Sequence, residues 1–160
     1  MGLVVEFSQE TERRHRMTHT IEELLEERQE VLVSYCALAG LSSFDKRGDE
    51  DHQVKPGELQ SFCQILVDYT ALGHFEIYQR IIEGNERRIA VKKLADELYP
   101  AIAETTDHLV DFNDKYDDLD NEDYSQLSAD LSRIGEVLAI RSELEDRLLS
   151  VLRPSCFPSR

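Results

Sequence analysis

Residues 66–80 read LVDYTALGHFEIYQR, a helical stretch that is apolar on more than one side and carries a single carboxylate, Asp68. At about 100° per residue, residues three and four apart fall on one face of a helix. The apolar residues with this spacing begin before residue 66. That face carries Leu59, Phe62, Leu66, Tyr69, Gly73 and Ile77. We expect this stripe to lie in the core, with Gly73 allowing another helix to approach closely.

A second face of the same helix is also apolar. Asp68 and Phe75 are seven residues apart, so they differ in direction by only about 20° and stand opposite the core stripe. Leu72 borders them, and Tyr78 lies toward one side. A helix with two apolar faces is either buried on both sides or offers the second face to a partner.

The helical wheel, which gives only the direction of each side chain around the helix, leaves both alternatives open. A short helix over residues 86–98 could cover the second face, and Asp68 would then pair internally with Arg28 or Arg141. Arg28, Arg141 and Glu145 all fall on the apolar stripes of their own helices, which favours an internal polar network for them.

The rest of the chain is also predicted to be helical. Thr20 and Glu23 have the spacing of a capping box and begin a first long helix that ends near Gly40. Further helices are predicted over residues 56–83, 86–98, 100–116 and 124–152, with Pro56 in a first turn and Pro100 opening the fourth segment. We expect an all-α fold, an antiparallel up-and-down bundle of four long helices plus a short fifth. Residues 1–160 would form one domain, with 1–19 and 153–160 as frayed termini.

Composition limits the classes of partner. The chain has 160 residues and a formal net charge of −15. Such a surface disfavours nucleic acid and anionic lipid, but it attracts basic proteins or simply maintains solubility. Three cysteines without C-x-x-C spacing, two of them in predicted helices, predict core thiols rather than disulfides. With neither a signal peptide nor a membrane span evident, we expect a cytoplasmic protein without direct nucleic-acid or membrane binding.

Signs of catalysis or metal binding are weak. None of the phosphate-binding glycine motifs and no nucleophile elbow is present. His15 and His19 are four residues apart and have no evident third ligand. Glu104 and His108 are also four apart, but no second pair duplicates them as a di-iron bundle requires. We expect no enzyme activity and no cofactor. A metal-binding or catalytic helical bundle remains an alternative, as does an adaptor for some basic protein.

Three stretches resemble one protein family. LVDY-x-x-x-GHF-x-IY-x-R at 66–80 resembles the signature helix of the Rsd/AlgQ family of bacterial anti-sigma factors. Arg28 followed by VLVSY at 31–35 is similar to the family's first long helix. IGE-x-L-x-x-R-x-x-LED-x-L at 134–148 resembles its last helix.

The resemblance implies a helical bundle that binds the housekeeping sigma factor of RNA polymerase. Family members engage sigma region 4, which hides surfaces needed for core polymerase and for the promoter −35 element, and so favours alternative sigma factors. The family links the positions of Asp68 and Phe75 to sigma binding. We expect Asp68 to meet a basic side chain and Leu72, Phe75 and Tyr78 to complete the partner-binding surface. Weak self-association through this apolar face is also expected.

The resemblance also extends to three charged residues of the predicted interior. Arg28, Arg141 and Glu145 match the family, and we expect them to support the binding helix from within the core rather than to contact the partner.

Overall fold

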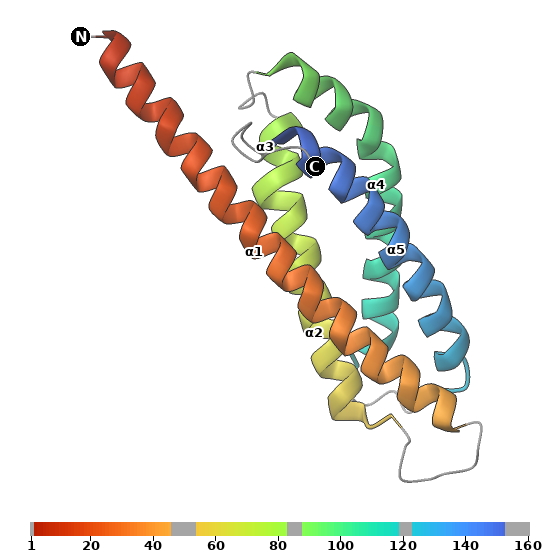
Figure 1. Cartoon of the computed structure of the whole chain (residues 1–160). Helices are drawn as coiled ribbons and strands as arrows, with labels where there is room; N and C mark the ends of the chain where they lie inside the picture. The colour runs from red at the N-terminus through yellow and green to blue at the C-terminus, as the bar shows by residue number, and fades with distance from the viewer. Residues whose placement is uncertain (1, 46–53, 83–87, 119–122, 153–160) are drawn as a thin grey trace.

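In the computed structural model, residues 2–45, 54–82, 88–118 and 123–152 are described, and they contain helices but no strands, which confirms the all-α class (Figure 1). The elements are α1 (Gly2–Asp45), α2 (Pro56–Leu72), the π-helical turn η2 (Gly73–Tyr78), α3 (Gln79–Ile82), α4 (Ile89–Tyr116) and α5 (Leu127–Leu152). None of the helices in these ranges has a stretch that is both long and apolar enough to cross a membrane.

One shared core holds the helices together. α2 packs against α1 and α4, and α5 packs against α4 and α1. Five of the six predicted stripe residues are at most 1% exposed, and Gly73 is also buried. The core stripe read from the sequence is therefore confirmed. Pro56 occupies the first turn of α2, as predicted, because a proline there removes only an N–H that has no helical partner.

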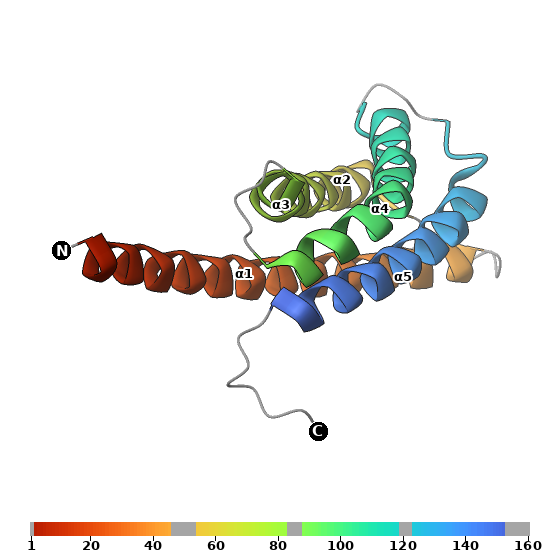
Figure 2. The same cartoon turned by 90° about the horizontal axis from the view of Figure 1, so that it is seen from above.

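The first helix begins earlier and ends later than predicted. Residues 2–19, for which we expected a frayed terminus, are helical, and they extend beyond the other helices in both views (Figures 1 and 2). Thr20 does not cap a helix, since its hydroxyl donates to the Arg16 carbonyl one turn earlier (2.9 Å). No glycine or proline interrupts residues 3–39, and Gly40 alone costs only about 1 kcal/mol. The other predicted frayed terminus, 153–160, lies outside the described residues.

The prediction of a separate short helix over residues 86–98 is wrong. Its described part belongs to α4, which continues through Pro100 to Tyr116. Pro100 and Asp96, whose carbonyl the proline leaves without a helical donor, are both exposed, so water can satisfy that carbonyl. Figure 2 shows α4 changing direction along its length, as expected for a helix with an internal proline.

Two predicted helix boundaries lie outside the described residues, and the predicted start of the last helix differs slightly from the observed one. The stop at Gly84-Asn85 and the cap at Asp120 or Asn121 fall outside the described ranges. α5 begins at Leu127 rather than near Tyr124, because Asp123 first forms a turn in which its Oδ1 accepts from the Ser125 N–H (3.1 Å) and hydroxyl (2.7 Å).

The cysteines divide between core and surface. Cys63 is buried, and burial raises the pKa of its thiol to about 12, so it behaves as the inert core residue expected. Cys36 is exposed, contrary to the expectation that it would be a core residue. Cys156 lies in the undescribed C-terminal segment.

A close contact between α1 and α5 depends on Gly135. A Cβ placed there would lie 2.2 Å from the Tyr35 Oη and 2.7 Å from its Cζ. The same hydroxyl donates to the Leu131 carbonyl (2.8 Å), so the ring cannot move without losing that bond. We expect Gly135→Ala to lower the free energy of unfolding by about 1–3 kcal/mol in a urea titration.

Gly57→Ala is the matched control for this prediction. A Cβ at Gly57, in the first turn of α2, meets nothing within 4 Å. This change should leave stability unchanged or raise it by up to about 1 kcal/mol, because alanine restricts the unfolded chain. Equal midpoints for Gly135→Ala and wild type would contradict the close contact.

Candidate partner-binding site

Asp68 lies exposed on α2. Among the described residues, its hydrogen-bond partner is Gln64, whose Nε2 donates to Oδ1 (3.0 Å). The internal partners considered for it, Arg28 and Arg141, bind other groups. Burial raises the pKa of Glu27 on α1, and the charges of Glu23 and then Asp68 add to this effect. Asp68 therefore contributes to a negative surface shared by α1 and α2.

Phe75 is the exposed apolar residue of the predicted surface. Its side chain is 58% exposed, and its ring stands edge-on to His74, with centroids 4.8 Å apart and planes at 85°. The first part of α4 does not cover it, so the second apolar face is open at this position. Exposed phenylalanines of this kind are typical anchors of protein interfaces.

The π-helical turn changes the direction in which Phe75 points. In η2 the Gln79 N–H bonds the His74 carbonyl, five residues back rather than four. Each residue of such a turn advances by less than the 100° of an α-helix, so Phe75 falls behind its α-helical direction. It rotates toward Ala71 and Val67, and the three side chains line one groove beside α4. The regular helical wheel that aligned Phe75 with Asp68 does not include this change of direction.

The other two residues of the predicted surface lie deeper. Leu72 is partly buried against the core. Tyr78 is only 3% exposed, and its hydroxyl donates to Glu145 Oε2 (2.9 Å). The π-helical turn η2 helps to explain the burial of Tyr78, because it alters the direction in which the residues after Gly73 point. Of the four residues, the surface thus presents mainly Asp68 and Phe75.

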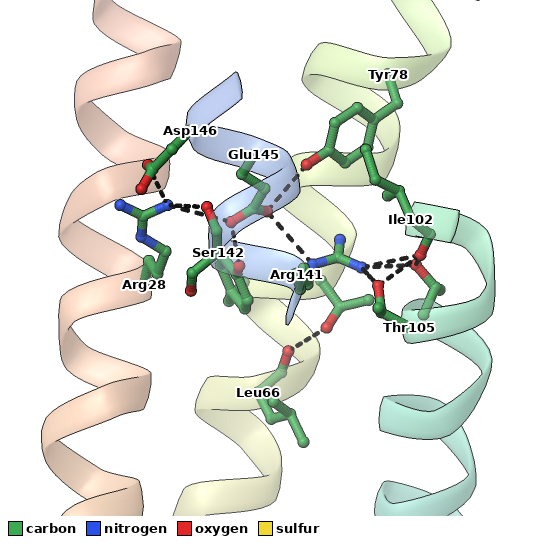
Figure 3. A network of polar contacts seen from close by, with 12 residues as sticks. Arg28, Leu66, Tyr78, Ile102, Thr105, Arg141, Ser142, Glu145 and Asp146 are labelled. Carbon is green, nitrogen blue, oxygen red and sulfur yellow. Dashed lines mark hydrogen bonds and ion pairs between the residues drawn. The ribbon is translucent and has the colours of Figure 1, made fainter. Parts of the chain in front are cut away.

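A buried polar network lies behind this surface, and Glu145 is its centre (Figure 3). Glu145 is 1% exposed and accepts hydrogen bonds from the hydroxyls of Tyr69 and Tyr78. Its carboxylate also lies 3.3 Å from Arg141 Nε and 3.6 Å from Arg28 Nη1. The two tyrosines come from α2 and η2, so this single carboxylate ties the binding helix to α5 and α1.

Arg141 is the buried cation of the network. It is fully buried, and its Nη1 donates to the hydroxyls of Thr105 (3.0 Å) and Thr106 (2.8 Å) on α4 (Figure 3). Its guanidinium lies 5.4 Å from the ring centre of Tyr69 and 5.8 Å from that of Tyr78. Sequence reasoning missed the two threonines, although adjacent hydroxyls in a buried stretch of an amphipathic helix are a usable signal.

Gly73 makes room for Arg141 where η2 begins. A Cβ at Gly73 would lie 3.2 Å from the Tyr78 ring and 3.3 Å from Arg141 Nη2. The sequence predicted the close approach of another helix at Gly73, but the nearest groups are side-chain ends, the Tyr78 ring and the Arg141 guanidinium, rather than a helix backbone. This contact joins the start of the π-helical turn to the network.

Electrostatics keeps the two tyrosines of the network protonated. Burial raises the pKa of both Tyr69 and Tyr78, and the charge of Glu145 raises it further. Their hydroxyls therefore act as hydrogen-bond donors to Glu145. Arg28 links this interior to the surface, because its Nη1 also lies 2.9 Å from the exposed Asp146.

Within the described ranges, no group of three or more His, Cys, Asp or Glu residues is arranged to hold a metal ion. His15 and His19 are exposed on α1. His108 lies 3.9 Å from Glu104, one turn away on α4. The residues of the alternative metal site are therefore distributed over two helices as isolated pairs.

Comparison with known proteins identifies the family of this chain. Residues 3–153 match the family described as "Regulator of RNA polymerase sigma(70) subunit, Rsd/AlgQ". A "Regulator of sigma D" from Yersinia pseudotuberculosis is 37% identical over 133 residues, covering 81% of this chain and 76% of the relative. Proteins with the same name from Yersinia enterocolitica (36% over 132 residues; 81% and 77%) and Enterobacter sp. strain 638 (35% over 147 residues; 88% and 84%) are similarly related. The chain belongs to the Rsd/AlgQ family of regulators of the RNA polymerase sigma(70) subunit.

Proposed function

We propose that this protein is an anti-sigma factor that binds region 4 of the housekeeping sigma factor of RNA polymerase. Bound there, it would withhold the sigma factor from core polymerase and from the promoter −35 element, and so favour alternative sigma factors. It would act in the cytoplasm by binding alone, without turnover, cofactor or direct contact with nucleic acid. The observation that carries the proposal is that Asp68 on α2 and Phe75 in the following turn η2 are both exposed in a member of this family.

The chemistry of this surface suits a basic, DNA-binding partner. Asp68 keeps one hydrogen bond, to the neutral Gln64, so its carboxylate can accept a charge-assisted bond from an arginine of the partner. Phe75 and the partly buried Leu72 would supply apolar contact around that bond. The net charge of −15 would accelerate encounter with a positively charged module.

The rest of the fold would hold this surface in place. We propose that the four long helical segments form one antiparallel up-and-down bundle, which the path of the chain in Figure 1 supports. Within it, Arg28, Arg141 and Glu145 would fix the helix that carries Asp68 and Phe75. In this proposal Tyr78 supports the surface from below through Glu145.

Isothermal titration of isolated region 4 into the protein tests this function. We expect one molecule of region 4 to bind per chain, and the affinity to fall as salt rises from about 0.05 to 0.2 M, because exposed charges are screened over this range. A duplex containing the −35 element should compete with the protein for region 4. Absence of heat and of competition at low salt would contradict the proposal.

A further inference from the structure

An apolar groove of about 210 Å³ runs between α2–η2 and α4. Val67, Ala71 and Phe75 line one side, and Thr106, Leu109 and Val110 line the other. Phe75, Val110 and Val67 are 58%, 43% and 39% exposed, so the groove opens to solvent. It is smaller than the roughly 300–1,000 Å³ of small-molecule sites, which favours individual side chains of a protein as its occupants.

Thr106, Thr70 and His74 are the polar residues that line the groove, and the hydroxyls of the two threonines already have partners. The Thr106 hydroxyl accepts from Arg141 Nη1 (2.8 Å) and lies 3.1 Å from the Ile102 carbonyl, to which it donates. The Thr70 hydroxyl donates to the Leu66 carbonyl (2.7 Å). With these hydroxyls engaged, the floor of the groove offers methyl groups and aliphatic side chains. Such a floor selects an apolar anchor.

The borders of the groove are acidic. On α4, Asp107 and Asp114 stand three and four residues from Val110, so all three share one exposed side of the helix. On α2, Asp68 is exposed three residues before Ala71. The neighbouring cation Lys115 places its Nζ 2.7 Å from Asp130 of α5 instead. An apolar floor between two negative borders is complementary to an apolar side chain flanked by lysine or arginine.

We propose that the groove between α2–η2 and α4 is the second half of the partner-binding surface and receives an apolar side chain from a basic amphipathic helix of the same partner. This inference rests on the proposed function and adds α4 to the surface. The rotation of Phe75 by η2 places its ring at the mouth of the groove, where it can cover the inserted side chain. A helix lying there would bring its basic flanks to Asp68 on one border and to Asp107 and Asp114 on the other. A second copy of this chain would instead bring like charges together along both borders.

Val110→Glu is the variant that tests the groove. It places a carboxylate among apolar groups, and the added negative charge would by itself favour a basic partner, so a fall in affinity reports the loss of the apolar contact. In a titration with isolated region 4, we expect the affinity to fall by roughly ten- to a hundred-fold. Val67→Glu, on the opposite side, should have the same effect, and both positions are exposed enough for the variants to fold.

Ile140→Glu is the matched control, because Ile140 is 52% exposed on α5. It should bind region 4 like wild type, with all three variants melting near the wild-type temperature. If wild type binds region 4 and the two groove variants bind equally well, the groove is overturned while the proposed function stands. If the wild-type protein does not bind region 4, both the proposed function and the role of the groove are contradicted. A wild-type dimer in sedimentation that Val110→Glu dissociates would also overturn the inference, because the groove would then serve self-association.

Discussion

Glu145→Ala is expected to lower the free energy of unfolding by about 3–5 kcal/mol, the usual effect of breaking a buried ion pair. The loss has two causes. Arg141, fully buried, loses its carboxylate at 3.3 Å, and the hydroxyls of Tyr69 and Tyr78 lose their acceptor. A urea titration followed by circular dichroism measures the change.

Two further variants isolate the cause. Asp146→Ala removes the adjacent carboxylate, which lies 2.9 Å from Arg28 but is 61% exposed, and should cost at most about 1 kcal/mol. The double variant Arg141→Met, Glu145→Leu should recover the part of the lost stability that comes from the unpaired charge of Arg141, whereas the hydroxyls of Tyr69 and Tyr78 still lack their acceptor. If Glu145→Ala destabilised the protein no more than Asp146→Ala, the network would not hold the helices together.

The second large effect concerns binding. Asp68→Asn is expected to weaken binding of region 4 by about 2–3 kcal/mol, or about 30- to 150-fold, because the amide cannot form the charge-assisted bond proposed for the carboxylate. Stability should not change. Asp68 is exposed, and asparagine keeps an oxygen that can accept from Gln64. Isothermal titration with region 4 and a thermal melt measure the two quantities.

Asp96→Asn is the matched control for this change, because Asp96 is an exposed carboxylate on α4. Both variants alter net charge equally, so any general steering effect is the same in both. A similar small loss for Asp68→Asn and Asp96→Asn would show that Asp68 acts only through overall charge.

Periodicity predicted the core stripe of α2 and η2 well, because this stripe depends only on local spacing. The buried positions from Leu59 to Ile77 follow the wheel, and Pro56 fits the first turn. The exposure of Asp68 and Phe75 was also predictable, since both residues fall outside that stripe.

Features that depend on tertiary context were not predictable from spacing. A proline usually ends a helix, but packing of α4 against α2 and α5 carries the helix through Pro100. A regular wheel assumes an equal advance at every residue, so it could not give the π-helical turn at Gly73. That turn begins beside the guanidinium of Arg141 on α5, which is remote in sequence. Because spacing did not reveal the turn, Tyr78 was predicted to face a partner, whereas its hydroxyl donates to Glu145.

The wall of the candidate groove on α4 was missed for a similar reason. Leu109 and Val110 look like ordinary members of an amphipathic helix, and only the pairing of α4 with α2 brings them beside Phe75. Thr106 gave no apolar signal at all. It lines the groove while its hydroxyl accepts from Arg141.

Asp68 and Phe75 are together proposed to hold the sigma factor. Titration of isolated region 4 into the double variant Asp68→Asn, Phe75→Ala tests this proposal most directly, with a thermal melt to establish that the variant is folded. We expect a wild-type melting temperature and no detectable binding at concentrations that saturate the wild-type protein, because the charged contact and the apolar anchor are both removed. Wild-type affinity in the folded double variant would contradict the account.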